Sequence, residues 1–384
     1  MDQGRFFDMD DIKYRVLHIF SGYGGGISSL IINLLENKTD DFEFDVMAFS
    51  FQNGEQFLDR LRKIGCRAFK MPRLRVEGYR AFIRYVGDVL SMNHYDAIHC
   101  HITGWSMIPF YRLAKKAGIH RFFLHAHTTR YDRKLDRVFP ISRINRLINY
   151  RCSNAYFTCS DFAADYIFGK YLKRRKAVLI PNGIAKEKFI HALSEEQREE
   201  YIKSFGINPD ETVMLHVGRF SPAKNHDFIL EFVSALKTKD KRIRLLFVGD
   251  GELIKYVMDK SHKMGLNDNI LFLGHRSDIS NLMQFCDLMI LPSCYEGLPT
   301  VAVECQATGT PMLLADHITK QCDMGLGLLD FLPISHIDYW LKAFDNRKAK
   351  VQREVALSAI EKHGFTSEIA GKEYCRVIRE LINL

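Results

Sequence analysis

The sequence predicts an α/β protein of two domains, each built on a parallel β-sheet. Short apolar runs alternate with longer amphipathic stretches, which is typical of parallel strands joined by crossover helices. The chain has 384 residues, too many for one ordinary domain and enough for two. The alternation pauses at the turn signal Pro181-Asn182-Gly183 and resumes near residue 212. We therefore expect two Rossmann-like domains facing a cleft.

The expected strands are apolar runs bounded by polar or turn residues. The first half contains such runs at 14–20, 43–49, 66–71, 96–100, 121–126, 154–158 and 176–180. The second half contains them at 212–217, 243–248, 269–273, 287–291 and 311–315. Expected helices in the first half include 26–36, 78–92 and 105–117.

We place the N-terminal domain at residues 1–190, the C-terminal domain at 191–365 and a final helix at 366–384. The polar stretch 193–205 is rich in Glu and Gln, and we expect it to be helical and to connect the domains. We expect the final helix to return to the first domain. Its apolar and aromatic residues follow helical spacing, at positions 370, 374, 377 and 381.

Composition favours a cytoplasmic protein. The chain is 47% hydrophobic and 26% charged, which is ordinary for a soluble globular protein. It contains no apolar run of about 18 residues, and its acidic N-terminus lacks the pattern of a signal peptide. The nine cysteines include no Cys-x-x-Cys pair, and several lie in apolar runs. We expect buried thiols rather than disulfides or a zinc site.

Positive charge is concentrated in the first half. Residues 1–190 hold 31 Lys and Arg against 19 Asp and Glu, whereas residues 191–384 hold 23 against 27. Segments 61–75, 130–151 and 171–176 mix cations with apolar and aromatic residues. This mixture suits peripheral binding to an anionic bilayer, on the inner face of the cell membrane. Solvated basic surfaces are the alternative.

Two loops that follow expected strands could bind phosphate. The cluster Gly22-Tyr23-Gly24-Gly25-Gly26 precedes a helix, where backbone N–H groups can approach an anion. It is not G-x-G-x-x-G, and no acidic residue ends the next strand, so a dinucleotide cofactor is disfavoured. Arg219 and Lys224 lie on one strand-to-helix loop and suit a pyrophosphate. A flexible turn and a solvated loop are the respective alternatives.

The most informative segment is SCYEGLPTVAVE, which follows the apolar run DLMILP. Gly297 and Pro299 shape a turn, and Pro299 is placed to start a helix. Backbone N–H groups near Thr300 can then bind phosphate. Glu304 lies one turn further, among apolar residues, so its carboxylate needs a partner. Glu296 lies on the loop. The alternative is that both glutamates are solvated surface residues.

Together these motifs resemble the family 4 glycosyltransferases of the GT-B fold. The resemblance spans residues 13–384 and rests on GGGI, GRFSPAKN, FVGDGE, FLGH, YEGLPTVAVECQATGTP and the closing GF…Y helix, in that order. The GYGGGISSLI opening and the LADHITK segment look most like capsular and exopolysaccharide transferases. The resemblance implies a retaining hexosyltransferase with a nucleotide diphosphate sugar as donor, no cofactor and no metal.

The resemblance also assigns roles to residues, with Arg219 and Lys224 binding the donor diphosphate. Glu304 would bind the ribose, and Glu296 and His127 would contact the donor sugar. The other implied contacts are the turn Gly297, Leu298, Pro299 and Thr300 toward phosphate and sugar, His275 and Arg276 beside the nucleobase, and Gly25 and Gly26 toward the diphosphate. Cys305 replaces the family's usual alanine, and HITKQCD replaces its glycine-rich loop, so sugar contacts in that loop stay open.

Histidines end two strands of the first domain. Strand periodicity places His125 and His127 on one face, with His127 nearer the cleft, and we expect His99 and His101 to line the cleft. No carboxylate or thiolate spacing accompanies them, so we expect no metal. Asp8-Met9-Asp10 resembles a metal-binding motif of another transferase fold, but it precedes the first strand and we set it aside.

We therefore expect a glycosyltransferase that acts on a lipid-linked or oligosaccharide acceptor. Cations and helix N-termini would stabilise the leaving diphosphate, and we assign no protein nucleophile. A sugar-nucleotide epimerase of the same fold is the closest alternative. A non-enzymatic protein that binds anionic polymers is the other. It is disfavoured, as is nucleic acid as a partner, because the basic segments lack a recognisable reading module.

Overall fold

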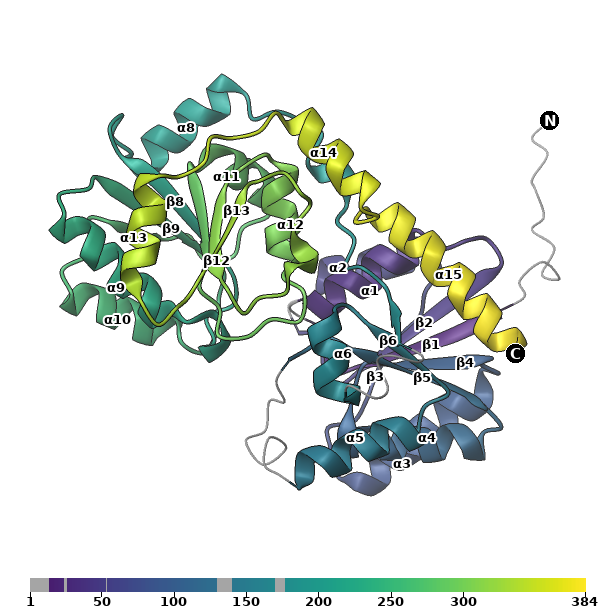
Figure 1. The fold of residues 1–384 in the computed structure, drawn as a ribbon. Helices are drawn as coiled ribbons and strands as arrows, with labels where there is room; N and C mark the ends of the chain where they lie inside the picture. Colours follow the sequence, from purple (N-terminus) through teal and green to yellow (C-terminus); the bar gives the residue numbers. More distant parts are fainter. Residues whose placement is uncertain (1–13, 24–25, 53, 130–139, 170–176) are drawn as a thin grey trace, which may run out of the picture. The chain divides into compact units, whose positions relative to one another are not determined.

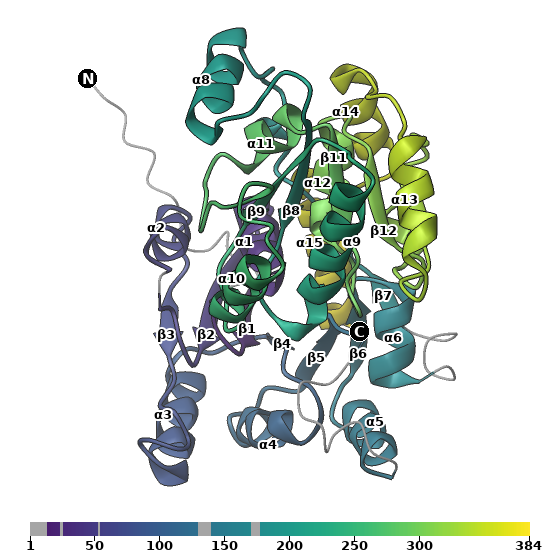
Figure 2. The same cartoon turned by 90° about the vertical axis from the view of Figure 1, so that its left-hand side faces the viewer.

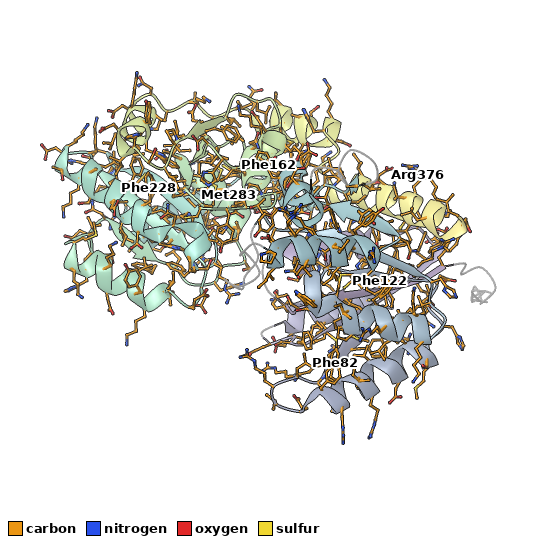
Figure 3. The ribbon with its side chains drawn as sticks, turned by 60° about the horizontal axis from the view of Figure 1, so that its bottom comes forward. Phe82, Phe122, Phe162, Phe228, Met283 and Arg376 are labelled. Carbon is orange, nitrogen blue, oxygen red and sulfur yellow. The ribbon has the colours of Figure 1, made fainter. Side chains whose placement is uncertain are left out.

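The structure is a computed structural model that describes residues 14–384, with gaps at 24–25, 53, 130–139 and 170–176. The chain divides into two compact units (Figure 1). Unit 1 consists of Met1–Gly183 and Ser367–Leu384, and unit 2 of Ile184–Thr366. Each unit has its own core: Phe82 and Phe122 lie in unit 1, and Phe228 and Met283 in unit 2 (Figure 3).

Unit 1 contains a seven-stranded parallel sheet in the order β3-β2-β1-β4-β5-β6-β7. The order reverses between β1 and β4, which pair directly, with His18 opposite His99. All seven strands were predicted from the sequence to within about two residues. Their bounds are β1 Tyr14–Phe20, β2 Phe42–Ala48, β3 Ala68–Lys70, β4 Ala97–Cys100, β5 Arg121–Ala126, β6 Ala155–Thr158 and β7 Ala177–Leu179.

Helices cover both faces of this sheet. Helices α1 and α15 pack together on one face, and α3, α4 and α5 lie on the other (Figures 1 and 2). Because both faces are covered, most strand residues are buried and the strands read as apolar runs. The helices are α1 Gly26–Glu36, α2 Glu55–Lys63, α3 Tyr79–Met92, α4 Ile108–Lys116, α5 Ile141–Arg151, α6 Asp161–Phe168 and α15 Ser367–Asn383.

The C-terminal helix α15 belongs to unit 1, as the sequence predicted. Ala370, Tyr374 and Val377 are buried in the core of unit 1, and Leu381 packs against it. The apolar stripe read from the sequence is therefore the face that this helix buries.

Unit 2 contains a six-stranded parallel sheet in the order β10-β9-β8-β11-β12-β13. The sequence predicted five of these strands and missed β13 (Leu329–Leu332). This strand is short and contains Asp330, which interrupts the apolar run and pairs with Lys348 at 2.8 Å. The other strands are β8 Thr212–Val217, β9 Ile243–Val248, β10 Ile270–Phe272, β11 Leu288–Leu291 and β12 Met312–Ala315.

The helices of unit 2 include one that we expected to connect the domains. Helix α8 lies within unit 2, because Tyr201 and Phe205 pack on Phe285 and the Tyr201 hydroxyl donates to Asp278 at 2.6 Å. Most residues of this helix are polar and exposed, so the sequence did not indicate that Tyr201 and Phe205 fix it to unit 2. The helices are α8 Glu195–Phe205, α9 His226–Thr238, α10 Ile254–Lys263, α11 Ile279–Phe285, α12 Thr300–Ala307, α13 Ile337–Asp345 and α14 Arg353–Lys362.

The sequence predicted buried thiols and no long apolar segment. Seven of the nine cysteines are buried thiols, whereas Cys152 is half-buried and Cys294 is exposed, so burial was wrong for those two. Among the described residues, no helix is both long enough and apolar enough to cross a bilayer.

The close contact between α15 and α1 makes a testable prediction at Gly371. A Cβ atom there would lie 2.6 Å from the Asn37 Cβ and 2.8 Å from the Asn37 carbonyl oxygen. We expect Gly371→Ala to lower the free energy of unfolding by about 1–3 kcal/mol, because α15 must shift. Gly87→Ala in α3 is the control, since its Cβ would have room (3.8 Å to Leu113) and should add about 0.5–1 kcal/mol. Urea unfolding measures both; equal effects would contradict the packing described.

Candidate active site

Two loops of unit 2 meet where the strand order of its sheet reverses. The reversal lies between β8 and β11, and open α/β sheets bind ligands beyond the carboxyl ends of the strands at such a point. The loop after β8 carries Arg219 and Lys224, and the loop after β11 carries Glu296. The two loops touch, because the Cys294 N–H donates to the Ala223 carbonyl at 2.7 Å.

Lys224 and Glu296 form an ion pair across these loops. The Lys224 ammonium donates to the Glu296 carboxylate at 2.6 Å, and both side chains are more than four-fifths buried. The sequence assigned these residues to one site, and the structure brings them together. Partial burial makes the pair stronger than an exposed one, yet an anionic ligand could compete with the carboxylate for the ammonium.

Arg219 is more exposed and is paired less firmly. Its guanidinium lies 3.2 Å from the Glu252 carboxylate, with the two side chains 71% and 51% exposed. An ion pair of this kind contributes little free energy, so the guanidinium can turn to a ligand at small cost. Glu252 was not singled out from the sequence, although it ends the FVGDGE motif.

Glycines hold the loops after β8 and β9 against each other. Gly249 adopts a φ of +134°, and a Cβ there would lie 2.1 Å from the Gly218 carbonyl oxygen. A Cβ at Gly251 would lie 2.5 Å from the Phe220 carbonyl oxygen, and the Phe220 N–H donates to the Asp250 carbonyl at 2.9 Å. Only glycine permits this backbone contact, which fixes the loop that carries Arg219.

The turn before α12 differs slightly from the prediction. Helix α12 begins at Thr300, so Pro299 precedes the helix as its cap instead of occupying the first helical position. The Ala302 N–H donates to the Pro299 carbonyl at 3.0 Å. The N–H groups of Thr300 and Val301 begin the helix and could bind an anion. Leu298 is buried and anchors the turn.

Glu304 lies on α12, half-buried among apolar neighbours. Burial raises the pKa of its carboxyl, and the charge of Lys188 opposes that shift. We expected the carboxylate to have a partner, but it makes no hydrogen bond within the described residues. A ligand hydroxyl could supply that partner.

The loop after β10 contains the two residues expected beside a nucleobase. His275 is exposed, whereas the Arg276 guanidinium is held by Asp278, with contacts of 2.8 Å and 2.5 Å. Gly274 accepts from the Gly249 N–H at 2.8 Å, so this loop joins the one after β9. The Arg276 guanidinium is therefore already paired within the protein, and His275 is the side chain more available to contact a ligand.

The segment HITKQCD, which departs from the family pattern, is held by two residues that the sequence did not identify. The Gln306 amide donates to the Cys322 carbonyl at 2.7 Å and accepts from the Met324 N–H at 2.9 Å. His317 hydrogen-bonds through Nε2 to the Ser293 carbonyl at 2.8 Å. A glutamine inside the apolar stretch VAVECQA was the available signal for the first contact.

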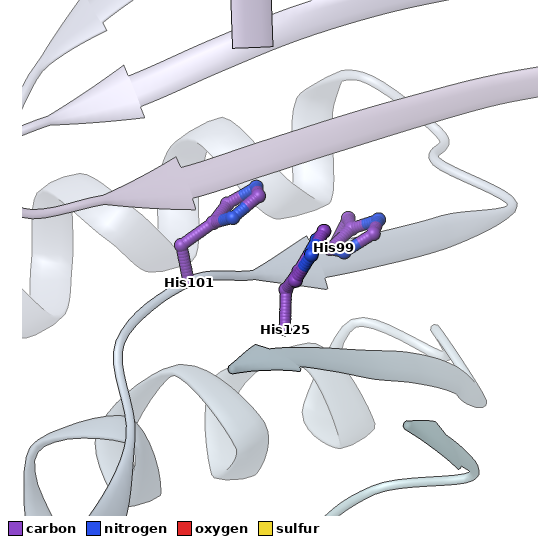
Figure 4. Close-up of side chains that lie close together, drawn as sticks. All are labelled: His99, His101 and His125. Atoms are coloured by element: carbon purple, nitrogen blue, oxygen red, sulfur yellow. The ribbon is translucent and has the colours of Figure 1, made fainter. Parts of the chain in front are cut away.

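Unit 1 contains a buried group of histidines. His99 and His101 at the end of β4 and His125 on β5 face one another (Figure 4). Each offers one nitrogen within 4.8 Å of the others, a spacing at which a metal ion could be held. His99 is completely buried, so our expectation that it lines a cleft was wrong. The carboxyl ends of β1, β4 and β5 are adjacent, which brings these side chains together.

His127 lies beyond the end of β5 and is half-buried. Its Nε2 is 2.6 Å from the His101 Nδ1, and its ring stacks on His125 with centroids 4.0 Å apart. The same-face placement of His125 and His127 is therefore confirmed. Burial lowers the pKa of His127 to about 3, so the ring is neutral at physiological pH.

Several predicted features fall outside the described residues or at their edge. Gly25, the Asp8-Met9-Asp10 motif and parts of the basic segments at 130–139 and 170–176 are outside them. Gly26 is the first residue of α1.

Comparison with known proteins identifies relatives over both units. Residues 197–324 match the description "Glycosyl transferases group 1", and residues 24–188 match "Glycosyltransferase Family 4". The putative glycosyltransferase EpsF of Bacillus subtilis is 30% identical over 94% of this chain and 95% of its own. An Escherichia coli UDP-Gal:α-D-GlcNAc-diphosphoundecaprenol α-1,3-galactosyltransferase is 33% identical over 40% of each chain.

The fold also matches a solved structure. HepE from Anabaena, crystallised with UDP and glucose, superposes with a TM-score of 0.73 over 96% of this chain and all of its own, at 17% identity. Both parallel sheets therefore have the GT-B architecture that the resemblance implied.

Glu304 makes a prediction about stability and pH. Because its pKa is raised in the folded protein, the folded state loses stability as pH rises above the ordinary carboxyl pKa of about 4. Glu304→Gln should therefore raise the free energy of unfolding at pH 7 and change it little near pH 4. In the control Glu211→Gln, which removes the negative charge that pairs with Arg244 at 3.0 Å, stability at pH 7 should fall. A loss in both variants would contradict the role assigned to burial.

Proposed function

Because the chain belongs to the family 4, or group 1, glycosyltransferases, we propose that it transfers a hexose with retention from a nucleotide diphosphate sugar to a lipid-linked saccharide. The chain is a nucleotide-sugar-dependent glycosyltransferase, and the acceptor and retention are parts of the proposal. We place the reaction in the synthesis of a capsular or extracellular polysaccharide. The observation that carries the proposal is the Lys224–Glu296 pair beside Arg219, at the strand reversal of unit 2.

On this proposal the donor diphosphate replaces protein carboxylates as the partner of two cations. Lys224 would exchange Glu296 for a phosphate oxygen, and Arg219 would exchange Glu252. The carboxylate of Glu296 would then be able to accept hydroxyl groups of the donor sugar. The first turn of α12 would add backbone donors, and Glu304 would accept the ribose hydroxyls.

Transfer would then depend on stabilising the leaving diphosphate. Its charge grows as the glycosidic bond breaks, and two preorganised cations near a helix N-terminus lower the energy of that transition state. We assign His127 of unit 1 to the donor sugar, where a neutral imidazole can hydrogen-bond a hydroxyl. No residue is assigned as a nucleophile.

A lipid-linked acceptor is supported by the surface of unit 1. Helix α5 buries two asparagines, Asn145 and Asn149, and the side-chain amide oxygen of Asn149 accepts from the Gly104 N–H at 2.7 Å. Its outward face instead carries exposed apolar and basic residues: Arg143, Ile144, Leu147, Tyr150 and Arg151.

Helix α5 thus buries polar residues and exposes apolar and basic ones. This pattern suits a peripheral contact with an anionic bilayer at the inner face of the membrane. The E. coli relative is named for an acceptor carried on diphosphoundecaprenol.

We expect Arg219→Ala and Lys224→Ala each to weaken UDP binding by about tenfold to a hundredfold, and turnover by at least as much. A charge-assisted hydrogen bond contributes about 1.5–3 kcal/mol, which corresponds to that range. Arg242→Ala is a matched control, because Arg242 is 70% exposed and paired with Asp210 in unit 2 but lies at no candidate loop. Calorimetric titration with UDP measures affinity; wild-type affinity and turnover in both variants would refute the assignment.

The membrane contact predicts that Leu147→Asp with Tyr150→Asp releases the protein from vesicles that contain phosphatidylglycerol. The apolar face of α5 would lose buried area and gain two charges that the anionic surface repels. Ile202→Asp, at a 39% exposed apolar position on α8 of unit 2, should leave binding unchanged. Co-sedimentation measures the bound fraction. Equal binding of the wild type to anionic and neutral vesicles would refute this contact.

A further inference from the structure

A continuous chain of hydrogen bonds runs through the core of unit 1 and ends at His127. From His127 Nε2 it passes to His101 Nδ1 (2.6 Å), and from His101 Nε2 to His18 Nδ1 (3.0 Å). His18 Nε2 contacts the Tyr374 hydroxyl (3.1 Å), which contacts His99 Nδ1 (2.6 Å). The last atom, His99 Nε2, is buried and has no hydrogen-bond partner among the described residues.

The chemistry of these groups allows the hydrogen-bond chain two arrangements in which the Tyr374 hydroxyl both donates and accepts. A neutral imidazole has one N–H and one bare nitrogen, and a tyrosine hydroxyl donates one hydrogen bond. Burial keeps the rings neutral: it lowers the pKa of His18 to about 3 and that of His99 and His101 well below the usual value. In these two arrangements every bond points toward His127, or every bond points away from it. If the Tyr374 oxygen instead accepted from both His18 and His99, the hydroxyl hydrogen would have no acceptor among the described residues, which disfavours that third arrangement.

The buried end distinguishes the two arrangements. If all bonds point away from His127, His99 Nε2 carries a hydrogen that has no acceptor in the core. If all bonds point toward His127, His99 Nε2 is a bare acceptor. Buried N–H groups without an acceptor are rarer in proteins than acceptors without a donor, so the second arrangement is favoured. In it, His127 Nε2 accepts from His101, and the hydrogen of His127 is on Nδ1.

We propose that this chain fixes His127 as the Nδ1–H tautomer, with Tyr374 and His99 as positioning residues. His127 is half-buried, and its Nδ1 has no hydrogen-bond partner among the described residues. The ring then presents a donor, backed by His125 at 4.0 Å, to a hydroxyl of a bound sugar. The use of that donor rests on the proposed function; the tautomer does not.

The metal alternative uses the same nitrogens differently. A metal ion held by His99, His101 and His125 needs a bare nitrogen from each, whereas both nitrogens of His101 are already hydrogen-bonded to His127 and His18. Metal binding would therefore break the hydrogen bonds of His101. A metal site and the proposed hydrogen-bond chain exclude each other.

The test reads the tautomers directly in the full-length protein labelled with ¹⁵N-histidine. Long-range ¹H–¹⁵N spectra distinguish Nδ1–H from Nε2–H, and His127→Gln identifies the signals of His127. We expect Nδ1–H at His127, His101, His18 and His99. An Nε2–H tautomer at His127, rapid exchange between tautomers, or a stoichiometric transition metal found by elemental analysis of the purified protein would each overturn the proposal.

A pair of variants tests the coupling through Tyr374. In His99→Asp, studied at a pH at which the new carboxyl is ionised, the carboxylate can only accept. The Tyr374 hydroxyl then turns to it and every remaining bond reverses, placing the hydrogen of His127 on Nε2. Adding Tyr374→Phe cuts the chain, and His127 should return to Nδ1–H. Tyr95→Phe is the control, because its buried hydroxyl donates to Asp45 (2.8 Å) outside the chain. If His99→Asp leaves the tautomer of His127 unchanged, the relay is refuted.

Activity separates this inference from the proposed function. If both hold, His99→Asp lowers kcat about tenfold or more and leaves UDP affinity within about twofold, because unit 2 binds the nucleotide. If the protein transfers no sugar but His127 shows the expected Nδ1–H tautomer, the proposed function is refuted. The proposed hydrogen-bond chain in unit 1 is then still supported. Should the variants not fold, the wild-type spectrum alone still decides the tautomer.

Discussion

The direction of the strands is the constraint on which the rest of this structure depends. In a parallel sheet all carboxyl ends lie on one edge, and the loops that follow them must share it. At the reversal in unit 2, that edge gathers the cations of one loop and the glutamate of another. At the reversal in unit 1, it gathers histidines from three strands. The parallel direction of the strands is therefore enough to bring residues that are far apart in sequence close together.

The side chains at the two sheet edges interact in different ways. In unit 2, Lys224 and Arg219 each contact a carboxylate that an anion could replace, so the interactions are exchangeable. In unit 1, the histidines are neutral and their hydrogen bonds are directional, so the interactions specify an arrangement. Charge provides strength in the first case, and desolvation provides order in the second.

The sequence predicted most of the fold, because buried parallel strands leave unmistakable apolar runs. It missed β13, a short strand that contains Asp330. It predicted α8 as a helix but took it for the connection between the domains, because only two aromatic residues anchor this polar helix in unit 2. In the candidate site, motif order predicted which residues meet, including Lys224 and Glu296. It could not predict their partners in the ligand-free protein, such as Glu252 and Asp278, because those contacts depend on loop geometry.

Hydrogen bonds to Tyr374 join the first strand to the last helix, since His18 and Tyr374 are separated by 356 positions. During synthesis β1 leaves the ribosome before unit 2 and α15 leaves it after unit 2, because unit 2 is encoded entirely between them. The core of unit 1 therefore stays incomplete while unit 2 is already able to fold. An N-terminal segment that must wait in this way exposes the α1 surface to other contacts, and a chain cut short before residue 367 never covers it.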